Sequence, residues 1–481
     1  MRFVALGIIL ASLPLFVIWL QSGQRNRDLA MTLLGALVFF GGSLQLDAAI
    51  VSWPMWPGIS QGILVSPVDT LALALLVTRK PRGKWLPFTG LMASYLAVLA
   101  LSATYSSIPM ASMFSVWDFS RVFLVFLAVG GELSRPTAYP ALLRGFSFGL
   151  LVQAGYVIRE KLTGVVQATG TLSHQNLLGM MTELVFLNLL AALLEGERSR
   201  LILLGILAGA IVIAGGGSRA TLGLLGAASL LLIMLSLIRK STPSKIAMAA
   251  AAAGVLLAAV PFAMLTLESR FGTLSVTTEE TERDAMERAA RAISRDHPFG
   301  IGANLYTVVA NEGGYSQRAG VSWGGGNLAV PAHNAYLLVR AELGYHGQAV
   351  LLLLLLLPIA GGLIHAFRHR RLRCDGWTLG PAAALGAIAL HSSYEFNAVV
   401  YSVQLPLAIN IAIVAGRIRA SRIERAAAGR PNPVAREDGG DRSNSGVPRL
   451  PKIPAIRVAQ HPNGKSTNDG SFARSSQEAR N

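Results

Sequence analysis

Three short polar segments of this 481-residue chain combine side chains that bind anions or move protons. The first runs from Gly215 to Ala220 and contains Ser218 and Arg219. Glycines allow a tight turn, Ser218 can cap a following helix, and the exposed N–H groups of a helix N-terminus attract anions. With Arg219 in the first turn, the segment predicts an anion-binding site. The alternative is a tight turn whose Arg snorkels to a membrane interface.

The second segment is an expected amphipathic helix over residues 282–295. Its apolar residues recur at helical spacing, at Ala285, Met286, Ala289, Ala292 and Ile293. Such a helix can lie along a bilayer surface. Arg283 and Arg291 are eight residues apart and share a face, and guanidinium groups bind phosphate oxygens in a bidentate manner. Anionic lipid headgroups are the alternative partner on periodicity alone.

The third segment is His333-Asn334, directly before a long apolar run that carries Arg340 and Glu342. A histidine at this place can act as a general base near neutral pH. The positive end of the helix dipole disfavours the imidazolium form and helps to keep the ring able to accept a proton. An interfacial histidine without a catalytic role is the alternative.

Three further places carry polar groups near the ends of apolar runs. His174 and Asn176 precede one run, and His391 and Glu395 lie four residues apart near the end of another. Asp118 and Arg121 lie inside a run; Arg121 is a candidate for substrate binding, with a structural ion pair as the default. The eight histidines are scattered without paired ligand spacing, so we expect no metal site.

The elements that position these residues are membrane spans. The chain is 52% hydrophobic and 14% charged, against about 25% charged residues in soluble domains. Runs of about 20 apolar residues predict an all-α, polytopic integral membrane protein of about 12–13 transmembrane helices. The expected spans lie near residues 3–20, 28–46, 60–78, 87–104, 113–131, 140–158, 176–194, 200–214, 219–238, 246–266, 334–365, 377–395 and 398–416.

The net charge of +16 invites a nucleic-acid interpretation, but its location argues against one. Residues 417–481 carry 13 Lys and Arg against 6 Asp and Glu, whereas residues 267–332 carry 6 Arg against 8 acidic residues. Most other basic residues lie in short connectors, as the positive-inside rule requires. We therefore expect a membrane domain over 1–416, a large exterior loop at 267–332 and a disordered cytoplasmic tail at 417–481.

In order and position, the polar motifs resemble those of the O-antigen ligase and polysaccharide polymerase superfamily of bacterial inner-membrane glycosyltransferases. The resemblance covers roughly residues 165–400. It rests on segments 170–176, 217–219 and 297–302, on Arg283, and on His333-Asn334 with Glu342 and Gly344. The chain departs from the family pattern at Glu287, where an aromatic residue often stands.

The resemblance implies an inverting, metal-independent transferase without a cofactor, acting at the periplasmic face in the synthesis of lipopolysaccharide or exopolysaccharide. The donor would be a glycan on undecaprenyl diphosphate. His333 would be the base, and Arg219 and Arg283 would hold the diphosphate. The remaining candidates for substrate binding are Ser218, Asn334, His174, Asn176, Arg121, Arg291, Arg340 and Glu342.

The acceptor stays open at this point, because ligases and polymerases share the donor chemistry. It is lipid A-core for a ligase, the next lipid-linked unit for a polymerase, and a protein for an O-oligosaccharyltransferase of the same superfamily. Membrane lipids and polysaccharide-export proteins are further expected partners. The alternative from another class is a polysaccharide-lipid flippase or transporter, which would place its charges near the midplane of repeat-related helices.

Overall fold

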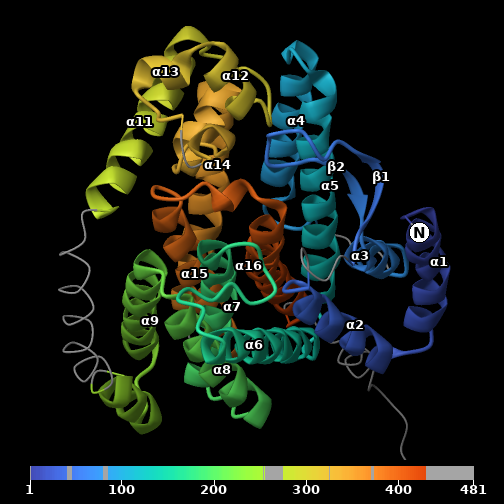
Figure 1. Cartoon of the computed structure of the whole chain (residues 1–481). Helices are drawn as coiled ribbons and strands as arrows, with labels where there is room; N and C mark the ends of the chain where they lie inside the picture. Colours follow the sequence, from blue (N-terminus) through green and yellow to red (C-terminus); the bar gives the residue numbers. More distant parts are fainter. Residues whose placement is uncertain are drawn as a thin grey trace, which may run out of the picture. The chain divides into compact units, whose positions relative to one another are not determined.

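A computed structural model of the chain describes residues 2–40, 46–79, 85–252, 254, 275–323, 326–369 and 373–428. The structure is about 76% helical with almost no strands, which confirms an all-α polytopic membrane protein (Figure 1). The expected span at 246–266, from residue 255 onward, lies outside the described residues, as does the expected tail beyond residue 428.

Seven helices of the described residues are long and apolar enough to cross a membrane. They are α1 (Arg2–Gln21), α5 (Pro109–Glu132), α6 (Ala138–Leu162), α7 (Gln175–Leu194), α9 (Arg219–Arg239), α14 (Ala335–Arg368) and α16 (Tyr401–Ala428). Shorter helices account for the other described segments that were expected to span. They are α2 (Gln24–Leu37), α3 (Pro67–Val77), α4 (Thr89–Tyr105), α8 (Arg200–Gly216) and α15 (Leu379–His391).

The segment expected to span at 60–78 is only partly helical. Strand β1 (Ala48–Ser52) pairs in an antiparallel manner with β2 (Gly62–Val65). Helix α3 then begins at Pro67, where Ser66 and Asp69 form a capping box and proline occupies the first turn. Because proline and the capping box fix this helix start, the residues before it are free to pair as a strand.

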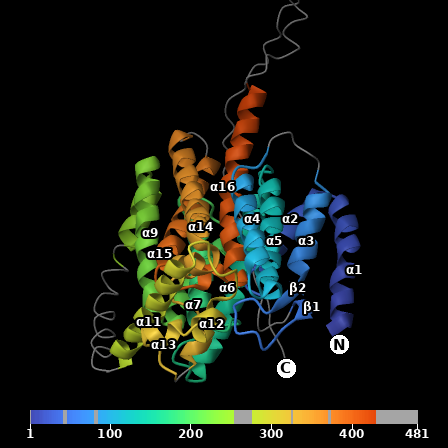
Figure 2. The ribbon, with the colours of Figure 1, turned by 90° about the horizontal axis from the view of Figure 1, so that it is seen from above.

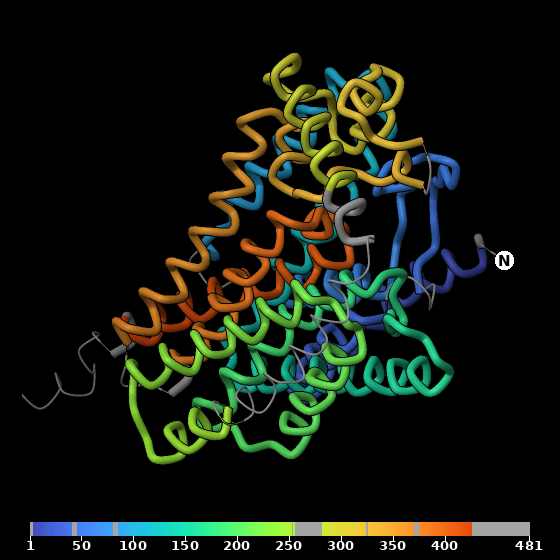
Figure 3. Tube along the Cα trace, turned by 60° about the vertical axis from the view of Figure 1, so that its left-hand side comes forward, coloured from blue at the N-terminus to red at the C-terminus, as the bar shows by residue number. Residues whose placement is uncertain are grey.

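The long helices alternate in direction between two ends of the bundle. At one end the backbone N–H of Ala335, at the start of α14, donates to the carbonyl of Ser392, just after α15. We call this the His333 end. At the other end the Arg239 guanidinium, at the end of α9, donates to the carbonyl of His369, just after α14. We call this the His369 end. Figure 3 follows α14, in orange, from one end to the other.

The helices between residues 275 and 329 gather over the start of α14 (Figures 1 and 2). They are α11 (Ser275–Asp296), α12 (Tyr306–Glu312), α13 (Tyr315–Ala319) and the short η1 (Asn327–Ala329). Ala285, Ala289 and Ile293 of α11 are fully buried in one cluster with Leu338 and Ala341 of α14. The amphipathic helix is thus present, but protein covers its apolar face. This corrects the expectation that it lies on the bilayer.

A kink in α14 accommodates the turn that follows α11. Gly344 leaves the helical conformation at φ 73°, a region that favours glycine. The carbonyls of Ala341 and Glu342 accept from the N–H groups of Ile301 and Gly302. This backbone pairing anchors the turn that follows α11 to α14.

Helix α16 continues to Ala428, past the boundary expected at residue 416. Arg417 is buried and donates to the Asp375 carboxylate at 3.1 Å. The buried ion pair explains why a basic segment that was expected to be disordered begins as helix.

Candidate functional site

The carboxylate of Glu395 connects the polar residues at the His333 end. Its Oε2 lies 3.1 Å from Nδ1 of His333, and its Oε1 accepts from Asn176 Nδ2 at 2.7 Å. Nη2 of Arg283 lies 3.3 Å from Oε1. Although His174 makes no direct contact with Glu395, it lies within electrostatic range of the carboxylate. The structure therefore brings together four predicted site residues from three separate segments: Asn176, Arg283, His333 and His174.

The contact with Glu395 sets the proton position on His333. An ionised carboxylate only accepts hydrogen bonds, so Nδ1 of the neutral ring must donate. Nε2 then carries a lone pair and is able to accept a proton. The His333 side chain is 21% exposed and Glu395 only 4%, so the ring reaches solvent while its partner is shielded. This is the arrangement of a histidine base oriented by a buried carboxylate.

Burial opposes ionisation of Glu395, but its neighbours outweigh burial. The hydrogen bond from His333 and the charges of His333, Arg283 and His391 hold the Glu395 pKa below its usual value. The pKa of His174 is also lowered, and burial is the largest cause. The nearby charges of His333 and Arg283 lower this pKa further, whereas the charge of Glu395 raises it. Near neutral pH the site thus combines an ionised carboxylate with an uncharged His174.

The start of α9, which carries Arg219, packs against the start of α7, but no described interaction joins the Arg219 side chain to Glu395, His333 or Arg283. A Cβ at Gly179 of α7 would collide with the Thr221 hydroxyl, so the first turns of α7 and α9 are in close contact. The Ser218 hydroxyl accepts from the Thr221 N–H at 3.4 Å and caps α9 as predicted. Arg219 itself is exposed.

Three capped helix N-termini meet at the His333 end. His174 Nδ1 accepts from the Asn176 N–H at the start of α7, and Asn334 Oδ1 accepts from the N–H groups of Tyr336 and Leu337 at the start of α14. The start of α9 is the third. Helix N-termini carry partial positive charge, so together with Arg219 and Arg283 they favour an anionic ligand.

Glu287, the position that departs from the family pattern, joins the site to a second basic region. Its Oε1 accepts from Asn334 Nδ2 at 3.3 Å, and its Oε2 accepts from Arg291 at 2.5 Å. Arg291 and Arg340, both predicted to bind substrate, line a cavity of about 640 Å³. Its other basic lining residues are Arg288, Arg295 and Arg318. Five guanidinium groups in one cavity favour a ligand with several negative charges.

Two residues predicted to bind substrate, Arg121 and Glu342, contact other parts of the protein instead of the His333 site. The Arg121 side chain, 3% exposed, pairs with Asp69 at 2.9 Å and with Asp118 at 3.3 Å. Arg121 thus forms the structural ion pair expected with Asp118 and a second ion pair with Asp69. Glu342 accepts from the Tyr306 N–H at 3.1 Å and holds the start of α12. Both are parts of the scaffold in this structure, and neither contacts His333 in any described interaction.

The sequence paired Glu395 with His391 and did not predict its contact with His333. The two residues stay neighbours, since the Glu395 N–H donates to the His391 carbonyl, but their side chains take different partners. Nδ1 of His391 lies 3.2 Å from the buried Glu183 carboxylate of α7, and the Glu395 carboxylate contacts His333. Among the described residues no group of three or more His, Cys, Asp or Glu side chains is suited to hold a metal ion.

Comparison with known proteins finds no family model that matches this chain and no curated protein that matches it. The site combines a histidine oriented by a buried carboxylate, Arg283 and three helix N-termini at one end of a helical bundle, and Arg219 stands at the third of these N-termini.

Proposed function

We propose that the protein is a membrane glycosyltransferase of the O-antigen ligase and polymerase type. It transfers a glycan from undecaprenyl diphosphate to a hydroxyl group of an acceptor glycan, in the synthesis of a cell-surface polysaccharide. The observation that carries this proposal is the His333–Glu395 pair, which lies beside Arg283 and the capped N-termini of α7 and α14.

The proposed reaction uses these side chains as follows. Nε2 of His333 takes the proton of the acceptor hydroxyl, and the oxygen attacks the anomeric carbon of the donor sugar. The bond from that carbon to the diphosphate breaks, and its electrons remain on the diphosphate oxygen. Arg219, Arg283 and the helix N-termini stabilise the negative charge that develops there. Direct displacement inverts the anomeric configuration.

The second basic region suits the rest of the substrate. The five-arginine cavity is joined to the base through Asn334, Glu287 and Arg291. Acidic or phosphorylated sugars of a bound glycan chain would pair with these guanidinium groups. A ligase, a polymerase and a protein O-oligosaccharyltransferase all fit this arrangement, because they differ only in the acceptor.

The proposed orientation places the His333 end in the periplasm of the bacterial inner membrane. Basic connectors lie at the opposite end, where Arg239 and Lys245 meet Glu195, and the positive-inside rule assigns that end to the cytoplasm. A reporter enzyme that is active only in the periplasm should be active when fused after Tyr315 and inactive when fused after Lys240. The reverse pattern would contradict both the orientation and the access of the site to a periplasmic donor.

A transfer assay with purified protein tests the activity itself. The wild-type protein, given a lipid-linked glycan and an acceptor glycan, should release undecaprenyl diphosphate and form a new glycosidic bond. His333→Ala should abolish bond formation at an unchanged protein level, whereas Gln317→Ala, an exposed residue of α13, serves as the matched control. Movement of the lipid across the bilayer without bond formation would support the flippase alternative.

A further inference from the structure

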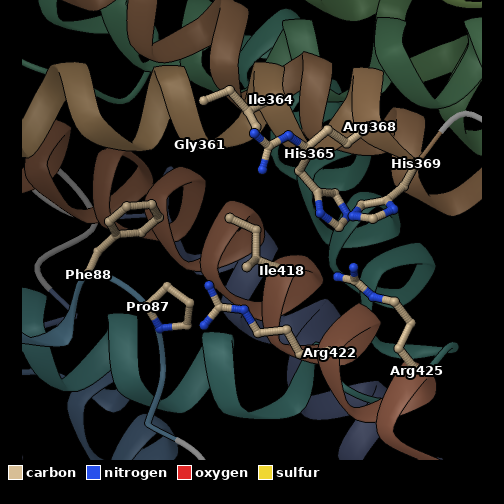
Figure 4. Close-up of a pocket in the computed structure, with 10 residues that line it drawn as sticks. All are labelled: Pro87, Phe88, Gly361, Ile364, His365, Arg368, His369, Ile418, Arg422 and Arg425. Atoms are coloured by element: carbon tan, nitrogen blue, oxygen red, sulfur yellow. The ribbon is translucent and has the colours of Figure 1, made fainter. Parts of the chain in front are cut away.

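A second cavity lies at the His369 end, between the last turns of α14 and α16. Its volume is about 660 Å³. One part of its lining is basic and the other apolar. The basic part consists of Arg368, Arg422 and Arg425 with His365 and His369, and the apolar part of Pro87, Phe88, Gly361, Ile364 and Ile418 (Figure 4). This composition matches neither an aqueous anion site nor an apolar pocket.

The three arginines line the cavity, and in the described part of the chain none of them forms an ion pair. The carboxylate of Asp375, whose charge acts on His369, is already engaged, at 3.1 Å each, by His365 and by Arg417. Figure 4 shows Arg368 extending from α14, while Arg422 and Arg425 extend from α16. Burial lowers the pKa of His369, and the charges of His365, Arg425 and Arg368 lower it further, against the opposing effect of Asp375.

The apolar part of the cavity continues along an exposed face of α14. Leu353, Leu357, Gly361, Ile364 and Arg368 follow one another at intervals of three or four residues, so they lie along one face of the helix. Leu353, Leu357 and Ile364 are exposed. A face with apolar residues followed by a terminal arginine is typical of a helix that passes from the lipid tails into the headgroup region.

The length of α14 supports this placement. From Ala335 to Arg368 the helix extends over about 50 Å at 1.5 Å per residue, although the kink at Gly344 shortens the path. The hydrocarbon core of a bilayer is only about 30 Å thick. With the starting residues of α14 in the headgroup region on one side, Arg368 therefore reaches the headgroup region on the other.

We propose that this cavity binds an anionic phospholipid of the bilayer, such as phosphatidylglycerol or cardiolipin. The phosphate lies between Arg368 of α14 and Arg422 and Arg425 of α16, and one acyl chain follows Ile364, Leu357 and Leu353. Basic pockets between membrane helices are known to bind anionic headgroups. The lipid then acts as a noncovalent link between the ends of the two helices. This proposal does not depend on the proposed transferase activity.

Lipid titration with purified protein in detergent tests the proposal. The probes are phosphatidylglycerol, cardiolipin, phosphatidylcholine and inorganic phosphate, and the readouts are lipid adducts in native mass spectrometry and the unfolding temperature. We expect adducts and a raised unfolding temperature with the two anionic lipids only. Equal effects of phosphatidylcholine would overturn the proposal, and so would equal effects of inorganic phosphate, which would indicate a phosphate site without a lipid.

Matched variants locate the binding. Arg368→Gln and Arg422→Gln should each weaken binding of the anionic lipid by roughly fivefold, and the double variant by more than tenfold. Arg198→Gln removes an exposed arginine at the same end of the bundle, outside the cavity, and should leave binding unchanged. The proposal fails if the double variant binds as the wild type does. Because both cavity arginines are exposed, the unfolding temperature without lipid should stay within a degree or two of the wild type, which separates lost binding from misfolding.

Discussion

Nδ1 of His333 lies 3.1 Å from Oε2 of Glu395, a carboxylate that follows it by 62 residues and is only 4% exposed. Because the carboxylate accepts the Nδ1 proton, the opposite nitrogen of the ring is left able to act as a base. The proposed chemistry depends on this relationship.

Glu395→Gln should lower kcat of glycan transfer by at least about 100-fold, with a much smaller effect on KM. The glutamine amide can donate to Nδ1 of His333, which would place the ring proton on Nε2 and remove the base. Initial rates with purified protein, at several acceptor concentrations, give kcat and KM separately. Glu424→Gln, at an exposed position near the end of α16, is the control. Unchanged kcat in Glu395→Gln would show that the carboxylate does not orient a catalytic base.

Arg219→Lys and Arg283→Lys should each raise KM for the lipid-linked donor by roughly tenfold. Lysine keeps the positive charge, but it lacks the planar fork that binds two phosphate oxygens. The comparison uses donor titrations of the two variants and of Arg198→Lys, which lies at the opposite end of the bundle. Wild-type donor KM in both variants would argue against bidentate binding of the diphosphate.

Gly179→Ala should impair transfer although Gly179 touches no substrate in the proposed reaction. A Cβ at this position collides with the Thr221 hydroxyl, so the start of α9 and with it Arg219 must move away from α7. Thr221→Ala removes the colliding hydroxyl and should restore part of the activity in the double variant. The four proteins of this cycle are compared by donor KM and unfolding temperature. Additive effects in the double variant would contradict steric coupling of α7 and α9.

The lowered pKa of Glu395 predicts an acid-dependent loss of stability. The folded state holds the carboxylate below its unfolded pKa, so the stabilisation is fully present above the unfolded value and is lost as the pH falls through the folded value. The difference in unfolding temperature between the wild type and Glu395→Gln should be largest above about pH 5 and should narrow below roughly pH 4. A constant difference across this range would show that ionised Glu395 is not stabilised by its neighbours.

Much of the architecture follows from local sequence patterns. Long apolar runs predicted α5, α7, α9 and α14 within a few residues, because burial of backbone groups in lipid requires helices. The spacing of apolar residues predicted the amphipathic part of α11, and Ser218 was identified as a helix cap. These features depend on residues that are neighbours along the chain.

The hairpin of β1 and β2 was not predicted from such local patterns. Residues 62–65 were expected to belong to a membrane span, but they form a strand whose pairing partners lie in residues 48–52. Arg121 is similar: its near partner Asp118 was visible in the sequence, and its second partner Asp69, 52 residues away, was not.

The residue types at the ends of the helices, and hence the arginines, the histidine and the caps of the site, are evident from the order of amino acids. The contacts of Glu395 with Asn176, Arg283 and His333, which are 219, 112 and 62 residues distant from it, depend on the fold. Hydropathy and helical period are local properties, whereas the partner of a buried charge is set by which helix ends pack together. A buried carboxylate without partners is strongly destabilising, and the packing of α7, α11, α14 and α15 brings the partners of Glu395 next to it.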